Sequence, residues 1–420
     1  MAMLALYLAL YPALVGSLLQ KLAPHSGKYR NLLLFPALWV LTEWARGWVM
    51  TGFPWLWAGY SQTMGPLKEL ASIIGTLGLS FVIAIIAGSL ALLAQKRWHS
   101  AAIIIPLTLI AAFIAPIVDP IKTTGKTASV VLVQGNIAQS MKWNPDALWP
   151  TMLKYMDLTR PDLEDNIVIW PEAAIPAPES MVGDFLVNAN KVANLNNSAI
   201  ITGIISHQHN HFYNALIVLG NHNKLHQAEG DYQLNGDNDY KKHHLLPIGE
   251  FVPFEELLRP IAPFFNLPMS SFARGAYQQP NLTALGYHIA AAICYEIAFP
   301  EQLRDNITPQ TDFLLTVSND AWFGHSNGPL QHMEIAQMRA IEFGRPLVRS
   351  TNNGVTAVVD AKGNIIKQLP QFEAAVLKAK VPLVSGETWF YRFGQWPVLG
   401  LSWLLFIFAG IRYWQQTRRR

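Results

Sequence analysis

The stretch GYHIAAAICYEIAFP, residues 286–300, predicts the fold of the central part of the chain and contains its single cysteine. The apolar run from His288 to Ile293 is short, has glycine before it and proline after it, and is followed by the polar, helix-like segment EQLRDN. This pattern predicts a buried strand followed by a helix. Cys294 then lies where the strand ends. Because a thiol near a helix start feels the positive end of the helix dipole, we expect more thiolate character than in a free cysteine. The alternative is a buried structural cysteine, which is common in proteins.

Other short apolar runs rich in β-branched residues are bounded by Gly, Pro or Asn, which is typical of strands. They lie at residues 129–137, 166–170, 198–206, 213–220, 313–319 and 355–360. Helical patterns lie between several of them, at about 148–158, 182–195 and 330–343. Alternation of strands with helices predicts an α/β domain whose strands are buried on both faces.

Both ends of the chain are poor in charge. Of its 420 residues, 51% are hydrophobic and only 14% are charged, against about 25% charged in soluble proteins. This deficit indicates a membrane protein, and apolar runs of suitable length predict five spans. These lie at residues 1–20, about 31–49, 71–94, 101–118 and about 396–411. The net charge of +3 is small and gives no sign of a nucleic-acid-binding face.

Basic residues follow the first, third and last predicted spans. They are Lys21, Lys28 and Arg30, then Lys96 and Arg97, then Arg412 and the three terminal arginines. The alternate loops lack such residues, and residues 47–66 are instead rich in Trp, Tyr, Gly and Pro, as at a membrane interface. The positive-inside rule therefore predicts that the basic loops are cytoplasmic. Residues 119–394, and Met1, are then expected outside, which in a bacterium means the periplasm.

Glu43 and Arg46 interrupt the second predicted span and, being three residues apart, share one helical face. Ionisable groups at this depth are costly unless they are paired or near an interface. Two interpretations stay open: a polar site that faces the helix bundle or the headgroups, and an ion pair at a helix end.

Three stretches outside the predicted spans place ionisable residues beside strand ends. They are NIVIWPEAAIP with Glu172, DYKKHHLLPIGEFVPF with Lys242 and Glu250, and ICYE with Cys294 and Glu296. Taken singly, each has an ordinary structural explanation: a surface acid at a turn, a solvated lysine, a core cysteine. Together they supply a thiol nucleophile, a carboxylate base and a cation for a developing oxyanion, which are the parts of covalent acyl transfer.

The motifs WPEAAIP, KKHHLLPIGE and ICYE resemble the Glu-Lys-Cys signature of the nitrilase, or carbon-nitrogen hydrolase, superfamily. The predicted spans, with TGFPWLWAGYSQ, VQGNIAQSMKW and the stretch from SNDAWFGH to STNNG, narrow the resemblance to the bacterial apolipoprotein N-acyltransferase family. The resemblance runs from about residue 31 to the C-terminus. It implies a periplasmic nitrilase-type αββα sandwich, residues 120–385, mounted on a transmembrane helix bundle of the inner membrane. Residues 1–119, with about four spans, and 386–420, with one span and a basic cytoplasmic tail, would form that bundle.

Within this resemblance, Glu172 corresponds to the general base, Lys242 to the oxyanion-stabilising lysine and Cys294 to the nucleophile. Lys241 is the competing lysine, but the Lys-x-His-Leu spacing of the family fits Lys242. A thioester acyl-enzyme and ping-pong kinetics are implied.

Four further residues match supporting positions of the family. Glu250 resembles a second essential acid, expected beside Lys242, and Trp143 matches a tryptophan near the acyl-donor site. Tyr295 and Glu296 match residues that follow the nucleophile.

The implied acyl donor is a phospholipid, and the implied acceptor is the α-amine of S-diacylglyceryl-cysteine in an apolipoprotein. No cofactor, metal or nucleic acid is expected, and the protein is expected to be a monomer. Residues 257–272 are a candidate apolar arm that covers the cleft or enters lipid, or an ordinary packed loop. The family usually has about eight spans, and this chain begins with what resembles a later one, so two explanations stay open: a true start that lies upstream, and a shortened member of the family.

Two other functions stay open: a membrane-tethered nitrilase-type amidase that hydrolyses small amides, and a non-catalytic membrane scaffold or transporter. His207, His209 and His211 alternate at a predicted hairpin without a carboxylate or thiol partner, so they are not expected to bind metal. The segment from Asn319 to Phe323 is expected either to shape the cleft wall or to pack structurally.

Overall fold

The computed structural model describes residues 2–223, 230–247, 249–251 and 272–418. The chain divides into two compact units. A helical unit comprises Met1–Ile121, Ile341–Gly344 and Gly386–Arg420, and an α/β unit comprises Lys122–Ala340 and Arg345–Ser385. Each unit is described separately below.

The α/β unit contains the strands. Their bounds are β1 Lys122–Gln134, β2 Ile167–Ile169, β3 Ile175–Pro178, β4 Ala199–Gln208, β5 His211–Gly220, β6 Asp239–Lys241, β7 Leu282–Ala284, β8 Tyr287–Ile293, β9 Thr311–Ser318, β10 Leu347–Thr351, β11 Ala357–Val359, β12 Ile365–Gln368 and β13 Ala375–Ser385. They form one sheet in the order β13-β1-β2-β4-β5-β6, with β3 beside β4, and a second in the order β12-β11-β10-β9-β8-β7. All seven predicted strands are present.

The strands are apolar on both sides because the first sheet lies between two hydrophobic layers. Val130 and Leu132 of β1 belong to the core between the sheets, whereas Val131 and Val133 point to the opposite face. That outer face is covered by two helices, α6 (Pro145–Thr159) and α7 (Gly183–Leu195). A continuous apolar run in the sequence is the expected result.

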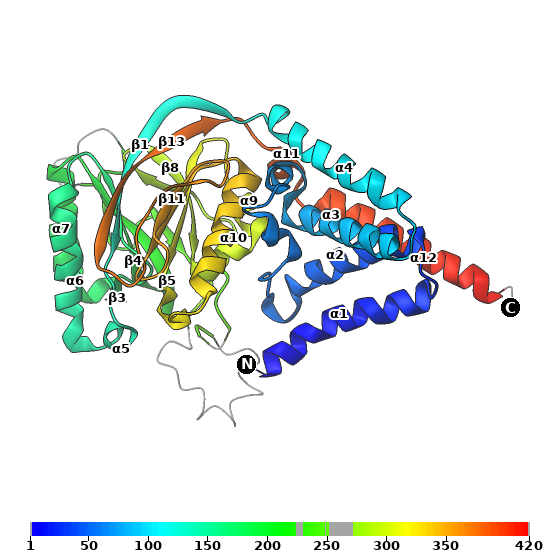
Figure 1. The fold of residues 1–420 in the computed structure, drawn as a ribbon. Helices are drawn as coiled ribbons and strands as arrows, with labels where there is room; N and C mark the ends of the chain where they lie inside the picture. Colours follow the sequence, from blue (N-terminus) through cyan, green and yellow to red (C-terminus); the bar gives the residue numbers. More distant parts are fainter. Residues whose placement is uncertain (1, 224–229, 248, 252–271, 419–420) are drawn as a thin grey trace, which may run out of the picture. The chain divides into compact units, whose positions relative to one another are not determined.

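Two further helices, α9 (Pro300–Asn306) and α10 (Gly328–Phe343), lie on the outer side of the second sheet (Figure 1). The layers of the unit are therefore helix, sheet, sheet and helix. This confirms the predicted αββα sandwich.

The helical unit contains most of the remaining helices, which are α1 Ala2–Leu22, α2 Phe35–Arg46, α3 Ala71–Ala94, α4 His99–Ile114, α11 Trp389–Phe393 and α12 Trp396–Arg418. In the described part of the chain, four helical segments are long and apolar enough to cross a membrane. They are Met3–Leu22, Lys68–Ala94, His99–Ile117 and Trp396–Arg418. Large apolar side chains on α4, including Leu107 and Phe113, are exposed, as expected for a surface that faces lipid.

The second predicted span has a different structure. Residues Arg30–Leu34 form a π-helical turn that continues into the 12-residue helix α2, and this stretch contains the charged residues Arg30, Glu43 and Arg46. Leu34, Leu38 and Val40 are buried, and α2 packs against α1, α3 and α12. This second predicted span is not among the four described segments that meet the length and hydropathy requirements, and its crossing of a membrane stays a prediction.

Glu43 holds the Trp-rich loop against α2. Its buried carboxylate accepts hydrogen bonds from the Trp39 indole (3.1 Å) and the Ala58 main-chain N–H (2.8 Å). The Trp57 indole donates to its main-chain oxygen at 3.1 Å. Arg46 lies 4.0 Å from the carboxylate. Both interpretations fit the structure, because the carboxylate is buried among groups of the helical unit and also pairs with Arg46 at the end of α2.

Candidate active site

Each candidate catalytic residue follows the end of a strand, Glu172 and Lys242 in the first sheet and Cys294 in the second. Glu172 follows β2, Lys242 follows β6, and Cys294 follows β8. Strand β6 runs parallel to β4 because two antiparallel pairings separate them, so its carboxyl end lies at the same edge as that of β2. Ligand sites of α/β sheets typically lie outside such carboxyl ends. The three side chains line one cavity of about 110 Å³.

The side chain of Lys242 is buried between two carboxylates. Its Nζ lies 3.2 Å from Glu172 Oε1 and 2.8 Å from Glu250 Oε2. The amide of Asn214, on β5, donates to both acids, at 2.8 Å to Glu172 Oε1 and 2.8 Å to Glu250 Oε1. Lys241 instead pairs with Asp239 at 2.8 Å. Of the two candidate lysines, therefore, Lys242 is the one that enters the cavity.

The neighbouring charges favour the ionised forms of Glu172 and Lys242. Burial alone would raise the pKa of Glu172, but the charges of Lys242 and Lys142, with hydrogen bonds from Asn214 and the Asn319 main-chain N–H, hold that pKa below its usual value. Burial opposes the charge of Lys242 as well, yet the two carboxylates raise the pKa of its ammonium well above the usual value. Glu172 is thus an ionised acceptor and Lys242 a fixed cation.

Lys142 is a site residue that the sequence analysis did not identify. It is buried, lines the cavity and donates from Nζ to the main-chain oxygen of Glu172 at 2.9 Å. Burial lowers the pKa of Lys142 to about 8, against the attraction of Glu172. Its neighbour Trp143 had been noted from the motif VQGNIAQSMKW, which was the available signal.

Cys294 begins a short 3-10 helix, Cys294–Ala298, with a left-handed backbone (φ +55°). Such a conformation in a non-glycine residue stores strain and often occurs at functional turns. Burial, helped by the negative charges of Glu172 and Asp320 and opposed by Lys242, raises the pKa of the thiol to about 12. The expected gain in thiolate character is therefore wrong, because burial and two carboxylates outweigh any effect of the helix start.

A buried group of charged and polar side chains around Asp320 contacts the main chain of Cys294. The carboxylate of Asp320 accepts hydrogen bonds from Ser318 (2.6 Å) and Arg349 (2.8 Å). The His332 ring bridges this carboxylate and the Cys294 main-chain oxygen, at 3.1 Å through Nδ1 and 3.0 Å through Nε2. Burial alone would raise the pKa of Asp320, but Arg349 and His332 hold it below its usual range. The group fixes the main chain at Cys294.

Glu296 connects the cysteine turn to the lysine segment. Its Oε1 accepts the main-chain N–H groups of His243 (2.7 Å) and His244 (3.0 Å). Its Oε2 accepts the N–H of Ile293 (2.8 Å) and the hydroxyl of Tyr240 (3.0 Å). With these partners, the buried carboxylate of Glu296 has a positioning role: it holds the residues after Lys242 beside the end of β8.

The other predicted supporting residues lie near the cavity. Trp143 lines it and packs against the cluster that contains Leu245. Tyr295 is buried and packs edge-on against Phe299, with ring centroids 5.2 Å apart. Trp322 lines the cavity with 64% of its surface exposed. The catalytic and donor-site roles of these residues stay predictions.

Two other predictions, the apolar arm and the histidines of the β4–β5 hairpin, concern residues outside the lining of this cavity. Residues 257–271 of the candidate arm lie outside the described residues. His207 and His211 do lie on the β4–β5 hairpin, as expected. Within the described ranges, no group of three potential metal ligands is found.

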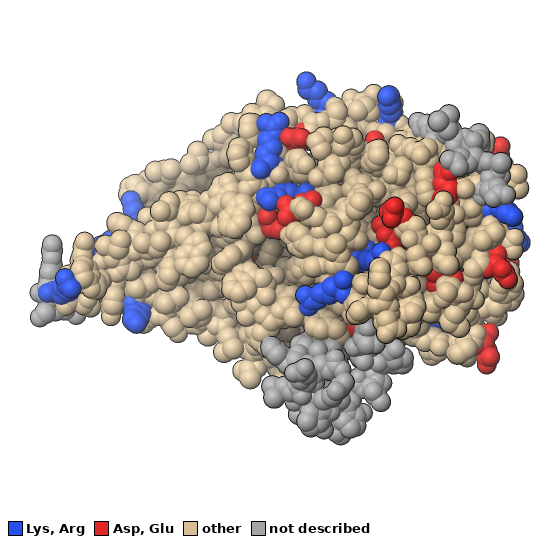
Figure 2. Space-filling view, turned by 180° about the vertical axis from the view of Figure 1, so that it is seen from behind, with Lys and Arg blue, Asp and Glu red and all other residues tan. Residues whose placement is uncertain are grey.

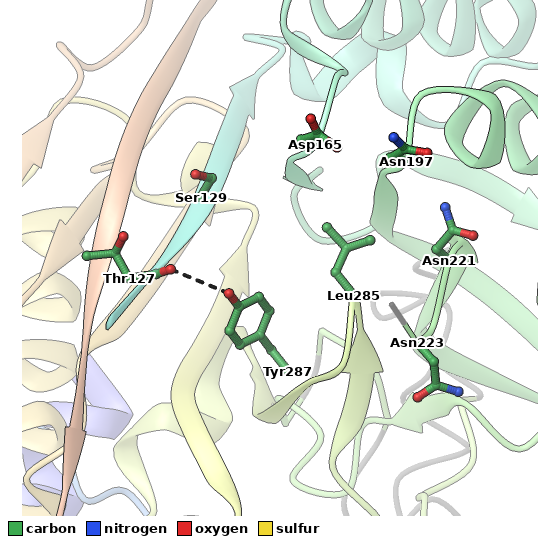
Figure 3. Close-up of a pocket in the computed structure, with 8 residues that line it drawn as sticks. All are labelled: Thr127, Ser129, Asp165, Asn197, Asn221, Asn223, Leu285 and Tyr287. Atoms are coloured by element: carbon green, nitrogen blue, oxygen red, sulfur yellow. Dashed lines mark hydrogen bonds between the residues drawn. The ribbon is translucent and has the colours of Figure 1, made fainter. Parts of the chain in front are cut away.

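A second cavity, of about 300 Å³, lies at the opposite edge of the α/β unit. Asp165 and Asn197 lie two residues before the parallel strands β2 and β4. Tyr287, whose hydroxyl donates to the Thr127 main-chain oxygen at 3.4 Å, begins β8 (Figure 3). The side chains around it are hydroxyls, amides, one carboxylate and one leucine. This lining has no nucleophile with an adjacent base, so the cavity beside Cys294 is the candidate active site.

Two family models match different parts of the chain. The family model described as carbon-nitrogen hydrolase matches residues 129–391, and the one described as apolipoprotein N-acyltransferase N-terminal domain matches residues 1–89. A crystal structure of a CN-hydrolase superfamily protein from Xanthomonas campestris aligns with a TM-score of 0.44 at 18% identity, covering 65% of this chain and 96% of that one.

Two curated relatives match nearly the whole chain. It is 68% identical over 419 residues to apolipoprotein N-acyltransferase of Shewanella oneidensis, covering 99% of this chain and 81% of the relative. It is 50% identical over 433 residues to apolipoprotein N-acyltransferase of Vibrio cholerae, covering 100% of this chain and 82% of the relative. The chain therefore belongs to the apolipoprotein N-acyltransferase family, with a carbon-nitrogen hydrolase domain.

Proposed function

We propose that the protein transfers a fatty acyl chain from a membrane phospholipid to the N-terminal amine of a diacylglyceryl-modified apolipoprotein, through a thioester on Cys294. The observation that carries this proposal is the meeting of Glu172, Lys242 and Cys294 in one cavity, in a chain with four potential membrane spans. The names of the relatives support an acyl transfer to apolipoproteins, and hence lipid substrates.

In the first half-reaction, Glu172 accepts the proton of Cys294 while the sulfur attacks the carbonyl carbon of the donor ester. Because the thiol has a high pKa, this proton moves as the sulfur attacks. Lys242 stabilises the oxyanion that forms, a contribution that is typically worth about 3 kcal/mol for one donor. The ester C–O bond then breaks, Glu172 returns the proton to the leaving oxygen, and a lysophospholipid departs.

In the second half-reaction, the acceptor amine attacks the thioester carbonyl and Glu172 accepts a proton from its nitrogen. Collapse of the tetrahedral intermediate breaks the C–S bond and forms the amide, and the proton returns to the sulfur of Cys294. The donor product leaves before the acceptor reacts, so the kinetics are ping-pong. The side chains present supply each proton transfer, and the proposed steps use no cofactor.

The location of the substrates fits the two units of the chain. We place residues 120–385 in the periplasm as the catalytic domain and residues 1–119 and 386–420 in the inner membrane, following the positions of the basic loops. A phospholipid donor and a lipidated acceptor would both be at the bilayer surface.

Purified protein in nanodiscs, given a phospholipid with a labelled acyl chain and a synthetic diacylglyceryl-cysteine peptide, tests the proposal. We expect labelled amide product from the native protein and none from Cys294→Ala or from a peptide with an acetylated α-amine. Release of labelled fatty acid without amide product would indicate hydrolysis and would refute the transfer.

A further inference from the structure

A large basic cavity lies in the helical unit, which contains none of the candidate catalytic residues. Its volume is about 610 Å³, and it is formed by the end of α1, the loop after α1 and the last turns of α12. Lys21, Lys28, Arg30 and Arg412 line it. None of the described residues that line it is acidic. Figure 2 shows Lys and Arg side chains, and no Asp or Glu, on the end of the helical unit at the left of the view. The cavity therefore has an uncompensated positive charge.

Two of the four cations are already engaged by the protein. Arg30 donates to the main-chain oxygens of Ala23 and Pro24, both at 3.0 Å, and so shapes the loop after α1. The guanidinium of Arg412 lies over the Tyr29 ring, 4.8 Å from its centroid. These contacts form the walls of the cavity.

Lys21 and Lys28 are exposed and have no hydrogen-bond or ion-pair partner among the described residues. An ammonium group offers three donors. Two ammonium groups and the Arg412 guanidinium around one hollow match the charge and the acceptor oxygens of a phosphate diester.

The position of the cavity indicates where that phosphate comes from. Lys21 lies in the last turn of α1, and Arg412 lies near the end of α12, so both follow long apolar segments. If these helices cross a bilayer, their basic ends lie at the level of the headgroups. Basic pockets between the ends of membrane helices are suited to anionic lipid headgroups.

We infer that this cavity binds the phosphate of an anionic phospholipid. A zwitterionic headgroup would bring its own ammonium group into a site that has only positive side chains, so lipids with a net negative headgroup are favoured. The bound lipid would connect the ends of α1 and α12. This inference does not depend on the acyl-transfer proposal, because it uses residues of the helical unit alone.

Native mass spectrometry of the full chain tests this inference, with phosphatidylglycerol and phosphatidylcholine of the same acyl chains offered in equal amounts. The test variant is Lys21→Gln/Lys28→Gln, which removes two exposed charges with no partners to lose. The matched control is Lys96→Gln/Arg418→Gln, which removes two exposed charges that do not line the cavity. Lys96 lies at the same end of the unit, because the preceding Gln95 is hydrogen-bonded to Ser26 in the loop after α1.

We expect the native protein to retain phosphatidylglycerol over phosphatidylcholine. Each lysine near a charged lipid surface contributes about 1 kcal/mol, so the loss of two lysines should cost about 2 kcal/mol. The test variant should therefore lose about 30-fold of this retention, and the control should stay within about twofold of the native protein. Inorganic phosphate at the same concentration should not displace the lipid. Equal retention of the two lipids, an equal loss in the control, or binding of inorganic phosphate in place of lipid would each overturn the inference.

Discussion

The ammonium group of Lys142 donates a 2.9 Å hydrogen bond to the main-chain oxygen of Glu172. This contact fixes the turn that carries the candidate base and places a second positive charge beside the cavity. We expect Lys142→Met to slow formation of the acyl-enzyme about 100-fold, because one misplaced catalytic group can cost that much. Single-turnover acylation followed by mass spectrometry measures this rate. Lys126→Met, which changes an exposed lysine of β1, should leave the rate unchanged.

The low pKa of Lys142, about 8, also predicts a pH effect. Below that value the side chain is charged and favours negative charge on Cys294. Above it the charge is lost, so the acylation rate of the native protein should fall as the pH rises through about 8. In Lys142→Met this fall should disappear. An unchanged alkaline fall in the variant would assign it to another group.

Glu250 supports the buried ammonium group of Lys242 and accepts a bond from Asn214. Removing one partner of a buried ion pair leaves a charge poorly compensated, so Glu250→Ala should lower the free energy of unfolding by about 3 kcal/mol. Glu250→Gln should cost less, because its amide oxygen still accepts from both neighbours. Thermal unfolding measures the difference, with the exposed Glu164→Ala as control. Equal unfolding temperatures for Glu250→Ala and Glu164→Ala would contradict the role of this pair.

The charge of Glu172 raises the pKa of Cys294, so its removal has opposite effects on two reactions. In Glu172→Gln the thiol should ionise more readily, and alkylation by iodoacetamide at neutral pH should be faster, by about tenfold for each unit of pKa. Acyl-enzyme formation should nevertheless be lost, because the proposed base is absent. Both reactions can be followed as mass shifts on the same sample. Slower alkylation in Glu172→Gln would show that the carboxylate does not hold the cysteine in its thiol form.

Because Gly203 on β4 has no side chain, the turn that contains Glu172 can pack closely against this strand. A Cβ at this position would lie 2.4 Å from the Ala173 nitrogen and 2.8 Å from the Glu172 Cα. Both are main-chain atoms, so they cannot move away unless the turn moves with them. Gly203→Ala should therefore shift Glu172, and the acylation rate should fall about 100-fold. Gly183→Ala, at the start of α7 with open space around it, is the control. Native activity in Gly203→Ala would mean that the turn tolerates displacement.

The sequence predicted the sandwich because its strands are continuous apolar runs, such as the one that ends at Cys294. Strand β10 was not predicted, since it contains Arg349, which is buried only because Asp320 pairs with it. Strand β13 was also missed; it alternates exposed lysines with buried residues and contains Pro382. A charged or interrupted strand can be recognised only when its partners are known.

The candidate site could be predicted only in part for the same reason. Three separated motifs supplied Glu172, Lys242 and Cys294, but the role of Lys142 depends on a contact with the main chain of Glu172. Asn214 was not identified as a site residue because it lies within an apolar strand. The pKa of Cys294 was predicted in the wrong direction, since a local argument from the helix start does not include burial or carboxylates distant in sequence.

The central claim is that Cys294 carries an acyl group taken from phospholipid. Intact-protein mass spectrometry after incubation with phospholipid vesicles tests it most directly. The account predicts a mass increase of one fatty acyl chain that hydroxylamine removes and that Cys294→Ala lacks. A folded native sample with no adduct, or an adduct of equal amount in Cys294→Ala, would contradict it.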